Sequence, residues 1–243
     1  MAIALVLSGG TGTRLGGDIP KQYIQAGGRM LIAYCLETFA AHPGVSDIFI
    51  VADEKWYDHI LHEMRRLGID TGGFAGFAKP GATRQLSIYN GLTGIAEYVK
   101  SWDRSDKDPA VIIHDAARPN LSADHLSDCL KALEGYDGVM PALPMKDTVY
   151  YSNDGKTVDR LLERSRIFAG QAPEIYRLGA YLKANERLLP DEILKINGST
   201  EPAILAGLSV AMINGDENNY KVTTSADLER FIHSRRPNEG TCS

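Results

Sequence analysis

Residues 1–23 read MAIALVLSGGTGTRLGGDIPKQY and carry the strongest structural signal in the chain. Residues 3–7 are an uninterrupted apolar run, which favours a strand buried on both faces, as in a parallel sheet. Glycines follow at once, and glycine lets a backbone turn sharply and bring its N–H groups close to an anion. Arg14 and Lys21 add two positive charges beyond this loop. A merely connecting turn does not require such charges, so the stretch predicts a strand followed by a cradle for a polyphosphate.

Two common nucleotide-binding fingerprints do not fit this loop. A Rossmann fingerprint needs a third glycine at its own spacing, and a P-loop needs Gly-Lys followed by Ser or Thr. Residues 8–14 read SGGTGTR and provide neither pattern. The predicted phosphate site is therefore of a different kind.

The composition is that of an ordinary globular protein. The chain has 243 residues, 44% of them hydrophobic and 23% charged, which is enough for one large α/β domain with a substantial core. A net charge of -5 gives no reason to propose nucleic acid or an anionic membrane as a partner. Cys35, Cys129 and Cys242 lie far apart, which favours reduced thiols in a cytoplasmic protein over disulfides or a zinc site. The apolar run near the N-terminus is too short for a signal peptide or a membrane span.

Strands and helices are expected to alternate along the chain. The patterns predict strands at residues 47–52, 110–113, 139–143 and 208–213, and helices at residues 30–41, 55–67, 83–99, 122–134, 178–189 and 225–234. This alternation indicates an α/β fold with a mainly parallel, twisted sheet in three layers, as one domain over residues 1–235. Residues 74–81 are interpreted as a connector and residues 236–243 as a flexible tail. Residues 147–168 break the rhythm and are interpreted as a projecting β-arm, a solvated surface hairpin being the alternative.

The glycine-rich loop that ends in Arg14, followed by Pro20-Lys21-Gln22-Tyr23, closely resembles the signature of one cytidylyltransferase family. That family includes the 2-C-methyl-D-erythritol 4-phosphate and ribitol-5-phosphate cytidylyltransferases. Four later segments resemble its motifs, in order: residues 81–87 (GATRQLS), 114–119 (HDAARP), 143–148 (LPMKDT) and 215–223 (GDENNYKVT). The resemblance covers roughly residues 2–230 and implies a Rossmann-like, GT-A-like nucleotidyltransferase fold. It also implies transfer of CMP from CTP to a small phosphate or phosphonate acceptor, with release of pyrophosphate.

The resemblance assigns nucleotide-side roles to particular residues. Arg14, Lys21 and Lys221 are expected to be catalytic, because fixed positive charge offsets the negative charge that develops during phosphoryl transfer. The residues expected to bind the nucleotide are Ser8, Gly9, Gly10, Thr11, Gly12, Thr13, Gly81, Arg84, Ser87, Asp115 and Ala116. Mg²⁺ is expected to bridge the triphosphate, held by Asp115 directly or through water. His114 is expected to be a structural hydrogen-bonding residue. Taken alone, Ser87 would be an incidental helix residue and Lys221 a solvated side chain.

The acceptor side is expected to involve the residues Asp115, Arg118, Asp147, Arg164, Ser199, Thr200 and Glu201. Arg164 aligns with an arginine that, in the related enzymes, reaches the acceptor phosphate from a second subunit. The resemblance therefore implies a homodimer in which the arm of each subunit embraces the other.

Two acceptor-side positions depart from the methylerythritol phosphate enzymes. Ala172 and Asn197 stand where those enzymes have threonines that contact the acceptor. Residues 199–203 (STEPA) resemble phosphonate cytidylyltransferases, which act on 2-aminoethylphosphonate: the two hydroxyls could bind the phosphonate, and Glu201 the ammonium group. That acceptor is the main expectation, with 2-C-methyl-D-erythritol 4-phosphate and ribitol 5-phosphate as alternatives. In a purely structural interpretation the same segment starts a helix, with Thr200 as its N-cap.

Two other classes of protein fit less well. A non-catalytic nucleotide-binding protein on this fold would be expected to have lost Arg14, Lys21 or Lys221, and all three are present. A glycosyltransferase on the same architecture would be expected to carry an Asp-x-Asp motif after a central strand. Residues 114–117 read HDAA and do not provide it.

Overall fold

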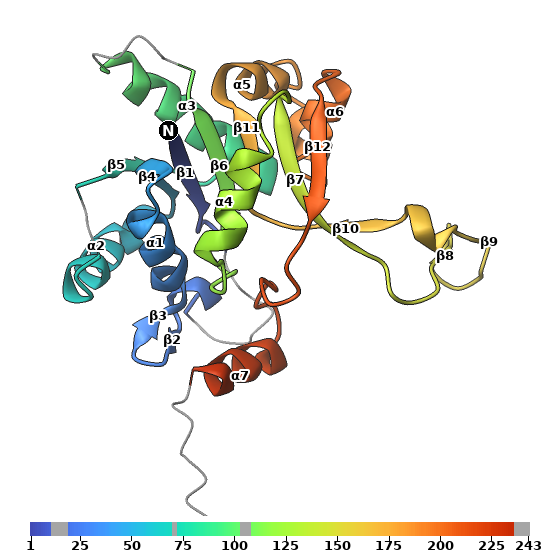
Figure 1. Ribbon diagram of the computed structural model, residues 1–243, viewed down its shortest axis with the longest axis horizontal. Coiled ribbons are helices and arrows are strands. Elements are labelled where there is room, and N and C mark those ends of the chain that lie inside the picture. The colour runs from blue at the N-terminus through green and yellow to red at the C-terminus, as the bar shows by residue number, and fades with distance from the viewer. Residues whose placement is uncertain (11–18, 70–71, 103–107, 236–243) are drawn as a thin grey trace, which may run out of the picture.

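A central sheet of eight strands organises the computed structural model, which describes residues 1–10, 19–69, 72–102 and 108–235 (Figure 1). Across the sheet the strands are β10 (Phe168–Gly170), β7 (Gly138–Pro144), β11 (Glu174–Arg177), β6 (Ala110–Asp115), β1 (Ala2–Leu7), β4 (Val45–Val51) and β5 (Phe74–Ala78). β10 and β11 pair with successive parts of one edge of β7, and β12 (Val210–Asn214) pairs with its other edge.

Most neighbouring strands run parallel, with β1 near the centre. β1 pairs in parallel with both β4 and β6, and β4 does so with β5. β11 is antiparallel to β6 and β7, and β10 is antiparallel to β7. Residues 2–6 of β1 are fully buried, as an uninterrupted apolar run requires when both faces of a strand are covered.

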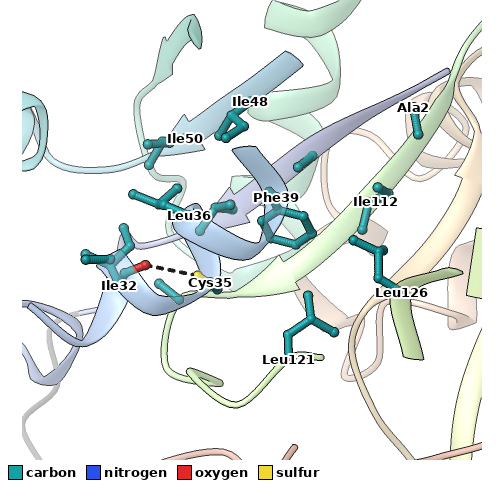
Figure 2. Packing of buried hydrophobic residues seen from close by; sticks show 14 of the residues in the cluster. Ala2, Ile32, Cys35, Leu36, Phe39, Ile48, Ile50, Ile112, Leu121 and Leu126 are labelled. Atoms are coloured by element: carbon teal, nitrogen blue, oxygen red, sulfur yellow. Dashed lines mark hydrogen bonds between the residues drawn. The ribbon is translucent and has the colours of Figure 1, made fainter. Parts of the chain in front are cut away.

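Helices cover both faces of the sheet, giving three layers. Alternate residues of β1 enter two separate cores: Ala4 and Val6 pack on one face, and Ile3 and Leu5 on the other. On the first face lie α1 (Leu31–Ala41), α2 (Tyr57–Arg66) and α4 (Ala123–Lys131). On the second face lie α3 (Arg84–Lys100), α5 (Leu178–Glu186) and α6 (Glu201–Leu205). Figure 2 shows Phe39 of α1 in the first core, together with Ile112 of β6 and Leu126 of α4.

Smaller elements complete the fold. A tight hairpin joins β2 (Gln25–Ala26) to β3 (Arg29–Met30) through two glycines with positive φ, and α7 (Ser225–Ser234) packs through Phe231 against Leu31 in a third small core. The short 3-10 turns are η2 (Lys21–Tyr23), η3 (Glu54–Trp56), η4 (Arg164–Arg166) and η5 (Glu192–Lys195).

The α/β class, the mainly parallel sheet and its three layers are confirmed, but the short strands β2, β3, β5, β10 and β11 were not expected. Residues 74–81 were expected to be a connector, yet residues 74–78 form the edge strand β5. The prediction is wrong because FAGFA is short and contains Gly76 at a φ of 145°, and these features weaken a strand pattern. β11 lies in the middle of the sheet and was not anticipated, since its sequence EIYR has a charge at each end.

Residues 147–168, the arm, contain a hairpin that projects from the sheet (Figure 1). β8 (Tyr150–Tyr151) pairs with β9 (Arg160–Leu161), and η4 follows. Across the segments described above, no helix has both the length and the apolar character needed to cross a bilayer.

Candidate active site

A cavity of about 430 Å³ lies at the carboxyl ends of β1 and β6, where ligands bind in open α/β sheets. Its wall is built from the loop after β1, η2, the start of α3, the end of β6 and the segment before α7. The predicted site residues that line it are Gly9, Gly10, Lys21, Gly81, Arg84, Ser87, Asp115 and Lys221. Residues 11–14, which include Arg14, lie outside the described residues.

Side chains of the Pro-Lys-Gln-Tyr segment hydrogen-bond to the backbone of the glycine loop. Gln22 Nε2 donates to the carbonyl oxygens of Ser8 and Gly10, each at 2.7 Å. The hydroxyls of Ser8 and Tyr23 are 2.8 Å apart, and Tyr23 can also donate to Ser8 O at 3.0 Å. Burial raises the pKa of Tyr23 to about 12, so its phenol stays protonated at neutral pH. The sequence predicts positive charge from Lys21 of this motif, and the structure adds that Gln22 and Tyr23 hold the glycine loop in place.

The segment before α3 depends on close packing. A Cβ atom on Gly9 would lie 2.4 Å from Pro80 Cβ, and one on Gly81 would lie 2.6 Å from Leu86 Cγ. Ser87 Oγ accepts from Gly81 N at 2.9 Å and donates to Thr83 O at 2.9 Å. Ser87 therefore fixes the backbone of the cavity wall as well as lining it.

Three cations surround one buried carboxylate at the far wall. Asp115 Oδ1 lies 3.2 Å from Arg84 Nε, and its Oδ2 lies 3.0 Å from Lys221 Nζ and 3.5 Å from Arg118 Nε. Burial alone would raise the pKa of Asp115, but Arg84, Lys221 and Arg118 together hold it well below its usual range. The pKa of Arg84 is raised in turn, because the negative charges of Asp115 and Glu174 outweigh the opposing effect of its burial. The cluster gives this wall an excess of positive charge, as a triphosphate site requires.

Three predicted residues lie behind the wall. Ala116 is buried and donates its N–H to Leu7 O at 3.0 Å, which ties β6 to β1, and Ala117 lines the cavity instead. Arg118 has a side chain only 13% exposed, and it donates to Asn219 O at 2.8 Å. It links the HDAARP segment to residues 215–223. His114 is fully buried, with Nε2 donating to Arg118 O at 3.0 Å, and burial lowers its pKa to about 4. A neutral, buried imidazole fits the structural role expected of it.

A comparison with models of known protein families agrees with the site geometry and the motifs. The family model described as IspD, 2-C-methyl-D-erythritol 4-phosphate cytidylyltransferase, matches residues 2–232. The chain belongs to this family. It is therefore a nucleotidyltransferase of the cytidylyltransferase type, and the resemblance drawn from its motifs is confirmed.

Individual relatives support the assignment. The chain is 33% identical to the 2-C-methyl-D-erythritol 4-phosphate cytidylyltransferase of Xanthomonas axonopodis pv. citri, covering 94% of this chain and 82% of that protein. It is also 33% identical to the bifunctional enzyme IspD/IspF of Paramagnetospirillum magneticum, but spans only 55% of the length of that protein. The crystal structure of 4-diphosphocytidyl-2C-methyl-D-erythritol synthase from Anaerococcus prevotii superposes with a TM-score of 0.78 at 23% identity, covering 96% of this chain and 95% of that one. This likeness supports the fold.

The residues expected to distinguish this chain within the IspD family make hydrogen bonds within the protein. Ser199 and Thr200 both donate their hydroxyl protons to Glu174, the second at 3.1 Å. Glu201 begins α6 and accepts from the backbone N–H of Asn197 at 3.0 Å. Thr200 occupies the N-cap position, as the structural interpretation proposed, but its side chain makes no capping hydrogen bond. Ala172 is buried, and its carbonyl accepts from the amide of Asn219.

Two further predicted residues lie on the arm. Asp147 is exposed, and Arg164 is exposed with Nη1 donating to Lys146 O at 2.8 Å. Neither residue lines the cavity of its own chain. Sequence reasoning also missed Glu174, because nothing in the sequence marks a single carboxylate as the partner of three hydroxyls.

Proposed function

We propose that this IspD-family enzyme transfers CMP from CTP to 2-C-methyl-D-erythritol 4-phosphate and releases pyrophosphate. The proposal rests mainly on the family match over residues 2–232, to which the cavity adds a suitable nucleotide site. The names of the relatives favour this acceptor over the phosphonate that was the main expectation from the sequence.

The contacts of residues 199–201 also argue against a phosphonate site in that segment. Both hydroxyls donate to Glu174, so they could donate to a phosphonate only by giving up their bonds to a buried carboxylate, which would leave Tyr176 as its remaining hydroxyl donor. The carboxylate of Glu201 already accepts from Asn197 N within its own turn. The two hydroxyls proposed to bind the phosphonate are therefore already engaged within the protein, which weakens the case for 2-aminoethylphosphonate.

The reaction is a displacement at phosphorus. An oxygen of the acceptor phosphate forms a bond to the α-phosphorus of CTP, and the bond from that phosphorus to the bridging oxygen of pyrophosphate breaks. The chain supplies no nucleophile in this proposal. Its glycine loop orients the triphosphate through backbone N–H groups, while Lys21 and Lys221 offset the charge that develops on the phosphoryl oxygens. Arg14 is assigned the same role by resemblance.

Magnesium is the cofactor that we propose for this reaction. Asp115 is the one carboxylate among the described residues that line the cavity. Within the same part of the chain, no group of three or more His, Cys, Asp or Glu side chains could hold a metal ion. Mg²⁺ often binds through one or two carboxylates together with substrate phosphates. The site fits an ion that arrives with CTP, and both oxygens of Asp115 already contact cations, which favours contact through water. When bound, the ion would neutralise charge on the triphosphate.

We also propose a homodimer formed through the arm. Tyr150, Val158 and Leu161 are apolar arm residues that are 58%, 68% and 63% exposed. A two-stranded hairpin is at best marginally stable alone, so a partner surface would stabilise it. Arg164 lies on this arm and does not line its own cavity, which supports a role in the neighbouring subunit. The cytoplasmic location remains a prediction.

The acceptor is tested by a direct comparison. The protein would be incubated with CTP, Mg²⁺ and either 2-C-methyl-D-erythritol 4-phosphate, ribitol 5-phosphate or 2-aminoethylphosphonate, and released pyrophosphate measured. We expect the first acceptor to be used with the highest kcat/KM. Faster use of either other acceptor would overturn the acceptor assignment but not membership of the family.

A further inference from the structure

A buried carboxylate lies behind the wall of the nucleotide cavity, with one side chain between it and a residue that lines the cavity. Glu174, the first residue of β11, is 8% exposed, and three hydroxyl groups surround it. Ser199 donates to Oε1, while Tyr176 and Thr200 contact Oε2 at 2.9 and 3.1 Å. A buried carboxylate needs such donors, and here they occupy both of its oxygens.

The hydroxyl of Ser199 connects this carboxylate to the cavity wall. A serine hydroxyl has one proton to donate and lone pairs that accept. Because Ser199 donates its proton to Glu174, its lone pairs are turned to Arg84, whose Nη1 donates to Ser199 Oγ at 2.7 Å. Arg84 can only donate, so the carboxylate acts by taking up the hydroxyl proton of Ser199 and leaving a lone pair of Ser199 Oγ facing the guanidinium.

Arg84 needs this support because it lies at the N-terminus of a helix. It is the first residue of the 17-residue helix α3, and the N-terminus of a helix disfavours a positive charge. Its guanidinium is held from two sides, by Asp115 at Nε (3.2 Å) and by Ser199 at Nη1 (2.7 Å). The side chain is 35% exposed and lines the cavity, so donors not used in these bonds can meet a ligand there.

We propose that Glu174 is a positioning residue for the nucleotide: acting through Ser199, it fixes the Arg84 guanidinium at the wall of the cavity. This inference rests on the proposed use of CTP. It assigns Ser199 and Thr200 to the support of the nucleotide side, in place of the acceptor contacts expected from the sequence.

A carboxylate performs this role better than an amide of the same shape. Three hydroxyl donors converge on the two oxygens of Glu174, whereas a glutamine would offer one oxygen and two N–H donors. At least one hydroxyl would then have to turn away or reverse its bond. Glu174→Gln is therefore expected to loosen Arg84 while changing the volume of the site very little.

The test is steady-state kinetics of Glu174→Gln and Ser199→Ala, with CTP varied at saturating acceptor. Each variant is expected to raise the KM for CTP about tenfold, equivalent to one lost charge-assisted hydrogen bond, with little change in kcat or in the KM for the acceptor. Glu192→Gln is a matched control, since Glu192 is exposed and, within the part of the chain that the structure describes, its one ion pair is with Lys195 in its own turn at 2.7 Å. A fall in melting temperature without a change in the KM for CTP would mean a purely structural role and overturn the inference.

The double variant sharpens the test. If both residues act through one guanidinium, Glu174→Gln combined with Ser199→Ala should raise the KM no further than either change alone, whereas a roughly hundredfold, additive rise would contradict the relay. Should Glu174→Gln fail to fold, Ser199→Ala alone decides, because an unchanged KM for CTP there also overturns the inference.

A binding measurement separates this inference from the proposed reaction. The rise in melting temperature caused by CTP with Mg²⁺, measured without acceptor, should be smaller in both variants than in the parent. If the parent released no pyrophosphate with any acceptor but still showed this difference, the proposed reaction would fail and the inference would stand. A parent that CTP does not stabilise would overturn both.

Discussion

On the nucleotide side of the cavity, motif residues hydrogen-bond to the backbone that forms the wall, whereas several residues predicted for the acceptor side either bond to groups within the protein or lie on the arm. Gln22, Tyr23 and Ser87 each hydrogen-bond to loop backbone beside the cavity. In contrast, Ser199 and Thr200 donate to a buried glutamate, and Arg164 lies on a projecting hairpin.

This difference follows from what each half must recognise. A triphosphate can be bound by backbone N–H groups and fixed charges that one chain preorganises, so the proposed nucleotide half needs no second subunit. In the proposed dimer the acceptor half would depend on the arm, because Arg164 does not line the cavity of its own chain. Residue types alone therefore predict the nucleotide side better than the acceptor side.

The largest expected effect is on the nucleotide side. Lys21→Ala should lower kcat by about 10²–10³-fold, because a fixed charge near the developing negative charge is lost. Pyrophosphate release measures the effect, and circular dichroism verifies the fold. Near-normal turnover would show that catalysis does not depend on the positive charge of Lys21.

The charge cluster is expected to contribute to stability as well. Asp115→Asn should lower the free energy of unfolding at pH 7 by about 3 kcal/mol, because three cations lose their common carboxylate. The folded-state pKa of Asp115 is depressed, so its contribution is complete above the unfolded pKa of about 4 and is lost as the pH falls further. Urea unfolding should show the gap between parent and variant narrowing below about pH 4. A gap that stays constant from pH 7 to pH 3 would be inconsistent with the ion pairs seen here.

Subunit exchange tests whether the acceptor side is completed by a partner. Arg164→Ala and Lys21→Ala should each be poorly active alone. In a mixed dimer, the subunit with an intact Lys21 receives an intact Arg164 from its partner, so mixing the two variants should restore part of the activity. Absence of recovery, with exchange demonstrated by mass spectrometry, would place Arg164 outside the neighbouring site.

The smallest expected effect concerns the packing of the glycine loop. Gly9→Ala should lower the free energy of unfolding by about 1–3 kcal/mol, because the new Cβ would lie 2.4 Å from Pro80 Cβ. Gly10→Ala is the matched comparison, since a Cβ there meets no atom of the described residues within 4 Å. Denaturant unfolding of both variants measures the difference. Equal stabilities would show that Pro80 yields easily and does not restrict the loop.

Some of the fold could be predicted because its signals are local. The apolar runs of β1 and β6 each act within a few residues, and the structure places both strands as expected. β5 and β11 could not be found in this way. Their short sequences lack a strand pattern, and they become strands because neighbouring strands supply hydrogen-bond partners.

The sequence by itself determined the nucleotide half of this protein: a buried strand, a glycine loop and the motif around Lys21 are contiguous, and their chemistry depends little on distant residues. Tertiary structure alone decided the roles of Glu174, Ser199 and Arg84. Ser199 meets Arg84 across 115 residues of sequence and Glu174 across 25. Whether a hydroxyl binds a ligand or a buried carboxylate depends on which partner the fold brings within hydrogen-bond distance, and residue type does not encode that choice.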